Sequence, residues 1–217
     1  MKKKIIKGKK HQKLLRDIIF FMLETEERRE AINNGYADFN YNFTNILAKY
    51  YNANDSCRIS EKSFDELKKA EVTIPESIND SSYSRETFRG SAVYTGNKNF
   101  EEQTPLQRVK GKFMFDHNPP VNIIRKKILE VNENKFNEDK TIEILKKYND
   151  CVFMLTRNED KLLKETKTII DNKEVSLNAN MPSEWKWEDK NANSRYNKCS
   201  IQISGRKMRF NTNKIPR

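Results

Sequence analysis

Cysteine, glycine, proline and long apolar runs are all scarce in this sequence, and each shortage excludes a class of protein. The three cysteines, at positions 57, 151 and 199, are too few and too far apart for a disulfide framework or a Cys-x-x-Cys zinc site. Six glycines and six prolines in 217 residues do not make a low-complexity chain. The longest apolar run, 18–23, falls far short of the ~20 residues that cross a bilayer. We expect a globular chain without a membrane segment.

The sequence also lacks the features of a signal peptide. Its N-terminal segment is rich in lysine, but neither an apolar region of the usual length nor a small-residue cleavage site follows. We therefore expect a cytoplasmic protein.

Acidic residues are missing from both ends of the chain. Residues 1–16 contain eight Lys or Arg and no acid, and residues 190–217 contain eight more and again no acid. The remaining 26 basic and 31 acidic residues give residues 17–189 a net charge of −5, although the whole chain carries +11. Two basic ends favour a polyanionic partner such as nucleic acid. Basic ends also improve solubility, and a Lys- and Asn-rich composition is typical of AT-rich genomes.

Hydrophobic spacing predicts that the first hundred residues are mainly helical. Apolar residues recur with helical spacing in three segments, which are 11–32, 43–54 and 60–72. Residues 73–105 are polar and rich in turn-forming residues, with a short strand expected at 91–95.

The pattern changes near residue 108. A strand is predicted at 108–116 and ends at Asp116, and a second, buried strand is predicted at 151–156. Helical spacing predicts helices at 121–131, 139–150 and 157–170, the last capped by Thr156 or Asn158. A final strand is predicted at 199–203. These elements together predict an α+β fold.

The order of strand, Asp-His pair, insert, strand and acidic helix resembles the HNH, or ββα-metal, nuclease superfamily. The resemblance is carried by "FDHNPPV", which contains Asp116 and His117, and by "CVFMLTRNEDKLLKE" in the second strand and its helix. It covers roughly residues 108–170. The mainly helical region at 1–105 contributes nothing to it, and we expect that region to recognise DNA. A ββα-metal nuclease core at 106–217 follows, with a long insert between its two strands and a basic C-terminal tail.

The resemblance implies that Asp116 ligates a divalent cation and that His117 is the general base. Phosphodiester hydrolysis needs a nucleophilic water and neutralised charge on the phosphate and the leaving oxygen. A neutral imidazole accepts a proton from water near pH 7. Consecutive side chains alternate along a regular strand. We therefore expect the chain to turn at the strand end, so that both side chains reach one cleft.

The second cation ligand is expected on the following helix. Asp160 matches this position best, and Glu159 and Asn158 are the alternatives because helix boundaries vary by a residue or two. Asn149, just before the second strand, matches the family asparagine that braces the loop. Oxygen ligands and open positions for water and phosphate favour Mg²⁺.

The sequence departs from the family pattern in three ways. The insert from Asn118 to Cys151 is long, the predicted helix has no histidine, and no cysteine pairs supply a structural zinc site. These departures leave the exact ligand set open.

Each motif also has a structural explanation. A histidine at a strand end often has no chemical role, and Asp116 could cap the helix that begins near Val121. Residues 158–160 suit the first turn of any helix, the two acids among them because of its dipole. A rival catalytic pattern, PD-(D/E)xK, would use Asp116, Glu159 and Lys161. That pattern needs a strand where a helix start is predicted.

Substrate contacts are expected from basic side chains near the site and in the C-terminal region. Arg125 and Lys126 lie on the helix after the Asp-His pair, and Arg195 and Lys198 lie in a Trp-rich basic segment. Trp185 and Trp187 either stack on bases or pack in the core. We expect double-stranded DNA as the partner.

The size and parts of the chain resemble those of a type II restriction endonuclease. A homing-type endonuclease or a nuclease toxin would have similar parts, and a homodimer would suit double-strand cutting at a palindrome. The non-enzymatic alternative is a nucleic-acid-binding protein that uses its basic ends. It predicts binding without cleavage.

Overall fold

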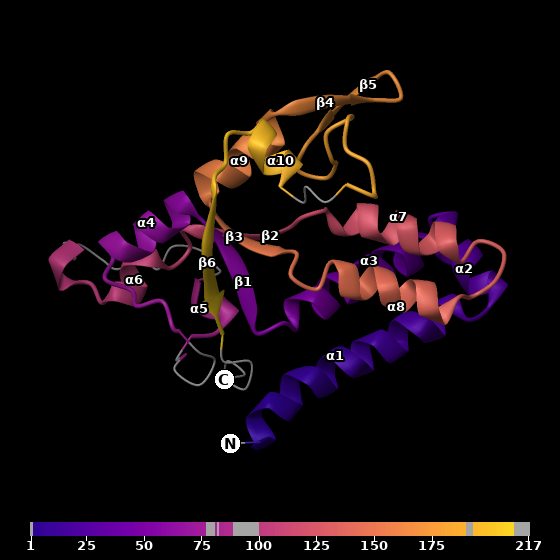
Figure 1. Cartoon of the computed structure of the whole chain (residues 1–217), viewed down its shortest axis with the longest axis horizontal. Coiled ribbons are helices and arrows are strands. Elements are labelled where there is room, and N and C mark those ends of the chain that lie inside the picture. Colours follow the sequence, from indigo (N-terminus) through magenta and orange to yellow (C-terminus); the bar gives the residue numbers. More distant parts are fainter. Residues whose placement is uncertain (1, 77–80, 82, 89–99, 190–192, 211–217) are drawn as a thin grey trace. The chain divides into compact units, whose positions relative to one another are not determined.

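The structure, a computed structural model, is an α+β fold (Figure 1). It describes residues 2–76, 81, 83–88, 100–189 and 193–210, so the strand predicted at 91–95 lies outside the described residues. Two compact units cut across the boundary expected near residue 105. The helical unit combines Met1–Asn54 with His117–Cys151, and the sheet unit combines Asp55–Asp116 with Val152–Arg217.

The helical unit contains five helices from two distant segments of the described chain. They are α1 (Lys2–Leu23), α2 (Glu26–Asn33), α3 (Ala37–Asn52), α7 (Val121–Val131) and α8 (Glu138–Lys147). Helix α3 packs against α1, α2 and α7, and α7 packs against α8. The long insert between the two predicted strands is therefore helical and completes the core of this unit.

The helix predicted at 11–32 is two helices because Thr25 starts a new one. Thr25 has an extended backbone, and its hydroxyl accepts a hydrogen bond from the backbone N–H of Arg28. The helix predicted at 121–131 is confirmed with the same bounds, and the helix predicted at 139–150 is α8. No helix of the described residues is long and apolar enough to cross a membrane.

The sheet unit is built on four strands of the described chain in the order β2-β3-β1-β6. These strands are β1 (Ser56–Ser60), β2 (Phe113–His117), β3 (Val152–Thr156) and β6 (Ile203–Arg209). Strand β1 is parallel to β3 and antiparallel to β6. The last strand was predicted at 199–203, which is too early. Helix α10 (Ser194–Lys198) comes just before this segment, and β6 begins at Ile203.

Strands β2 and β3 are antiparallel. The backbone N–H of Asn118 donates to the carbonyl of Cys151 (2.9 Å), and that of Arg157 donates to the carbonyl of Lys112 (3.1 Å). Residue numbers therefore increase along β2 in the direction in which they decrease along β3, as in an antiparallel pair. Helix α9 (Arg157–Glu165) follows β3 directly and packs against it.

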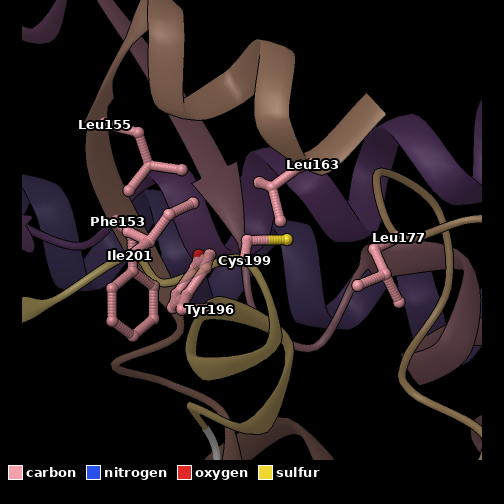
Figure 2. Close-up of a cluster of buried hydrophobic side chains, with 7 residues drawn as sticks. All are labelled: Phe153, Leu155, Leu163, Leu177, Tyr196, Cys199 and Ile201. Carbon is pink, nitrogen blue, oxygen red and sulfur yellow. The ribbon is translucent and has the colours of Figure 1, made fainter. Parts of the chain in front are cut away.

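Two clusters of side chains, buried apart from the half-buried Phe115, hold the sheet unit together. One is aromatic: Phe88 lies edge-to-face with Phe113 and Phe210, and Phe115 lies edge-to-face with Phe210. The other joins β3 and α9 to α10 and the segment after it (Figure 2). Its members are Phe153, Leu155, Leu163, Leu177, Tyr196, Cys199 and Ile201.

Shorter elements complete the sheet unit. They are α4 (Glu61–Lys69), α5 (Arg85–Phe88), a 3₁₀ turn (Phe100–Glu102), α6 (Pro105–Val109), β4 (Lys167–Ile170) and β5 (Lys173–Ser176). The predicted helix at 60–72 is α4, and Ser60 is its N-cap. The helix predicted at 157–170 ends at Glu165, because Thr166 is extended and leads into β4.

Candidate functional site

Asp116 lies in a nearly buried ion pair with Arg195. Its side chain is 12% exposed, and the Arg195 side chain is 0% exposed. The Arg195 guanidinium donates to Oδ2 of Asp116 and to the carbonyls of Leu177 and Asn178 (3.1 Å each). The hydroxyl of Tyr196 donates to the same Oδ2 (2.7 Å). These donors leave Asp116 tied to α10 rather than presented to solvent.

The net effect of burial and neighbouring charges raises the pKa of both Arg195 and Tyr196, which keeps each of them protonated. Burial alone would lower the pKa of the Arg195 guanidinium, but the facing Asp116 carboxylate and Tyr196 hold it above its ordinary value. Burial, followed by the Asp116 charge, raises the pKa of Tyr196 well above its ordinary value. The phenol therefore keeps its proton and donates a hydrogen bond to Asp116.

Strand β2 continues through His117 rather than ending at Asp116. Consecutive side chains of a regular strand leave it on opposite faces. Asp116 is directed to Arg195 and Tyr196, so β2 does not bring Asp116 and His117 into one cleft by the turn that was expected. The side chain of His117 is half-buried.

Glu159 is buried at the start of α9 and closes its N-terminus. The side chain is 1% exposed. Its Oε2 accepts hydrogen bonds from the backbone N–H of Thr156 (2.8 Å), the Thr156 hydroxyl (3.0 Å) and the Ser60 hydroxyl (2.7 Å). The Thr156 hydroxyl in turn caps the N–H of Glu159, which makes a capping box. Glu159 thus has a structural role that joins α9 to the end of β1.

Replacing Glu159 by alanine should lower the free energy of unfolding by about 2–3 kcal/mol, because one cap is lost and buried donors lose their acceptor. Asp160→Ala is the matched control. Its side chain is only 12% exposed, but its partner Lys164, one turn on (2.6 Å), is 54% exposed. The substitution therefore leaves no buried charge without a partner and should cost about 1 kcal/mol or less. Urea unfolding of both variants measures the difference. Equal losses would contradict the capping role of Glu159.

The predicted cation ligands are not assembled in one place. Helix α9 begins beside Lys112 at the start of β2, whereas Asp116 lies four residues further along that strand, about 13 Å at the usual rise. Asp160 is paired with Lys164, and Asn158 is exposed. Among the described residues, no three His, Cys, Asp or Glu side chains form a group that could hold a metal ion. The side chains as they lie do not fit a cation site.

The rival Glu-x-Lys pattern lies on a helix. Glu159 is occupied by the capping box, and the exposed Lys161 pairs with Glu165 (3.4 Å). Side chains two positions apart on a helix do not face each other. The geometry that the PD-(D/E)xK reaction needs is therefore not formed here.

Three other predicted residues lie in the helical unit. Asn149 does brace chain segments: its Oδ1 accepts from Gln12 (2.8 Å) and its carbonyl accepts from Asn54 (2.6 Å). The Arg125 guanidinium donates to Asn40, and burial lowers its pKa. Arg125 and Lys126 line a hollow of about 710 Å³. Of its described lining side chains, four are glutamates and three are basic, so the hollow does not favour phosphate.

The two basic residues predicted in the C-terminal region differ in their surroundings. Arg195 is buried in the ion pair with Asp116, which corrects the expectation that it contacts phosphate. Lys198 is partly exposed and lies 3.5 Å from Glu184. Trp185 and Trp187 are both half-buried and lie edge-to-face, with ring centroids 6.1 Å apart.

A cleft in the sheet unit is lined by more basic than acidic side chains. Its volume is about 980 Å³. We call it the basic cleft, and its lining residues are Lys62, Asp65, Glu66, Lys69, Gln103, Gln107, Arg108, Lys110, Gly111, Lys112, Thr156, Arg157 and Asn158. Of these described residues, six are Lys or Arg and two are acidic. Asn158 is the one predicted site residue among them.

Sequence reasoning missed the basic cleft because its charges come from distant segments. Lys62 and Lys69 lie seven residues apart on α4 and share one face of that helix. Lys110 and Lys112 flank Gly111, whose φ of 77° is a left-handed conformation that favours glycine. The sequence "KGK" was a visible signal for this turn. Nothing in the sequence indicated that this turn lies near α4, because that proximity depends on the fold.

Comparisons with known proteins give no family for the chain. No protein-family model, no curated protein and no solved structure matches it. Its function is therefore inferred from the arrangement of its own residues.

Proposed function

We propose that this chain is an endonuclease that hydrolyses phosphodiester bonds of double-stranded DNA. The observation that supports this is the unit formed by β2, β3 and α9. Two antiparallel strands are followed directly by a helix that packs on the second strand, and the first strand ends in Asp116-His117. This is the order of elements that the resemblance to HNH nucleases implies.

In this proposal His117 is the general base that takes a proton from the attacking water. Asp116 is a positioning residue: its bonds to Arg195 and Tyr196 fix the end of β2 next to His117. Mg²⁺ belongs to the proposal through the resemblance alone. The described carboxylates do not fit a cation as they lie, so no step of the reaction is assigned to the metal.

The finer form of the proposal is a type II restriction endonuclease of the cytoplasm. A homodimer would place one site on each strand of a palindrome, and closed two-fold symmetry is the commonest form of oligomer. A toxin or a homing-type endonuclease remains an alternative with the same chemistry.

Incubation of plasmid and phage DNA with the purified chain, with Mg²⁺, Mn²⁺ or a chelator, tests the proposal. We expect cleavage with a divalent cation and none with the chelator. Discrete fragments would support a restriction enzyme, and a smear would support a toxin or general nuclease. Intact DNA under every condition would overturn the proposal.

A second candidate function is DNA binding without chemistry. It is favoured by the engagement of Asp116, Glu159 and Asp160, whose carboxylates already accept bonds from protein groups. This candidate predicts that wild-type protein shifts DNA in a mobility assay while no cation induces cleavage.

A further inference from the structure

We propose that the basic cleft of the sheet unit binds the phosphate backbone of DNA. The inference rests on the proposed function for the identity of the ligand. It does not require cleavage, and it assigns binding to residues that lie apart from Asp116. The supporting observations are the charge, position and exposure of the lysines that line the cleft.

The cleft keeps an excess of positive charge, although Arg108, one of its six basic residues, is paired with Glu71 (2.8 Å). Six basic and two acidic side chains line it within the described chain, whereas the hollow of the helical unit has more acids than bases. One of its acids, Glu66, lies 3.6 Å from Lys69 and 3.2 Å from Lys112. A single carboxylate shared by two ammonium groups leaves net positive charge, which attracts phosphates along a backbone.

Three separate elements direct these basic groups to one surface. Lys62 and Lys69 come from α4, Lys110 and Lys112 from the turn before β2, and Arg157 from the first residue of α9. The Arg157 side chain donates to the Gly111 carbonyl, which joins the start of α9 to that turn. Lysines held on rigid, connected elements give a surface of fixed shape rather than a mobile basic tail.

The N-terminus of α9 does not itself supply an anion site. The Glu159 carboxylate already occupies that end of the helix through the capping box. A small anion held by the helix is therefore not the natural ligand of the cleft. Its positive charge comes from lysines and arginines of separate elements, which suits the successive phosphates of an extended polyanion better than a single phosphate group.

The test is binding of a labelled mixed-sequence DNA duplex in the presence of a chelator, so that no cleavage occurs. The variant replaces Lys62, Lys69 and Lys110, all exposed, by glutamine. The dissociation constant should rise about tenfold or more, and the slope of log affinity against log salt should fall by about one per lost phosphate contact. Thermal melting verifies that the variant folds.

The matched control replaces Lys167, Lys173 and Lys186 by glutamine. These lysines are also exposed, belong to the same unit and lie outside the lining of the cleft. The control should bind within about twofold of wild type, since salt largely screens exposed charges that touch no phosphate. Equal weakening of both variants would overturn the inference, as would unchanged binding by the cleft variant. If the wild-type protein binds DNA through the cleft but cleaves it under no condition, the nuclease proposal is overturned and the inference about the cleft stands.

Discussion

Asp116→Ala should lower the free energy of unfolding by about 3–5 kcal/mol, the cost of leaving a buried charge without its partner. The reason is the position of Arg195, which is 0% exposed and has Asp116 as its acidic partner in the ion pair. The substitution also removes the acceptor of the Tyr196 hydroxyl, which is held in its protonated form. Chemical denaturation monitored by tryptophan fluorescence measures the loss.

A second substitution separates the unpaired charge from other effects of Asp116→Ala. In the double variant Asp116→Ala/Arg195→Met, no buried guanidinium remains, and we expect most of the lost stability to return. Asp65→Ala is the control: Asp65 is exposed on α4 of the same unit, and its loss should change stability by less than about 0.5 kcal/mol. If Asp116→Ala were as stable as this control but lost cation-dependent cleavage, Asp116 would be a ligand and not a structural residue.

Local signals in the sequence predicted much of the secondary structure. Ser60 and Thr156 were expected near helix starts, and each accepts a hydrogen bond from the third residue of its helix. The bounds of α7 match the period of its apolar residues, three of which are buried. Such features depend on contacts between residues a few positions apart, so the local sequence is enough to predict them.

Features that depend on distant contacts were not predictable. Arg195 lies in a basic segment, where a phosphate ligand is expected. It instead pairs with the carboxylate of Asp116, 79 residues earlier. Strand β1 has five residues and becomes a strand by pairing with both β3 and β6. An acid in the first turn of a helix, such as Glu159, is either a cation ligand or a structural residue. The hydrogen bond that Glu159 accepts from the hydroxyl of Ser60, 99 residues earlier, favours the structural role.

His117→Ala should reduce the rate of DNA cleavage by about 10²–10⁴-fold, the usual contribution of a general base. The position of His117 at the end of β2, next to a residue fixed by two buried donors, is what selects it. A base lost from the chemical step leaves substrate binding unchanged. The rate should therefore fall while the affinity for DNA, measured with a chelator, stays the same.

The chain offers a matched control in its other histidine. His11 is exposed on α1, so His11→Ala removes the same group without touching β2, and its cleavage rate should stay within about twofold of wild type because surface changes are mostly neutral. Wild-type cleavage in His117→Ala would show that another group activates the water. Lost cleavage together with a lowered melting temperature would assign the defect to folding. Because Asp116 stabilises the same strand, Asp116→Ala should show that combined loss, and His117→Ala should lose cleavage alone.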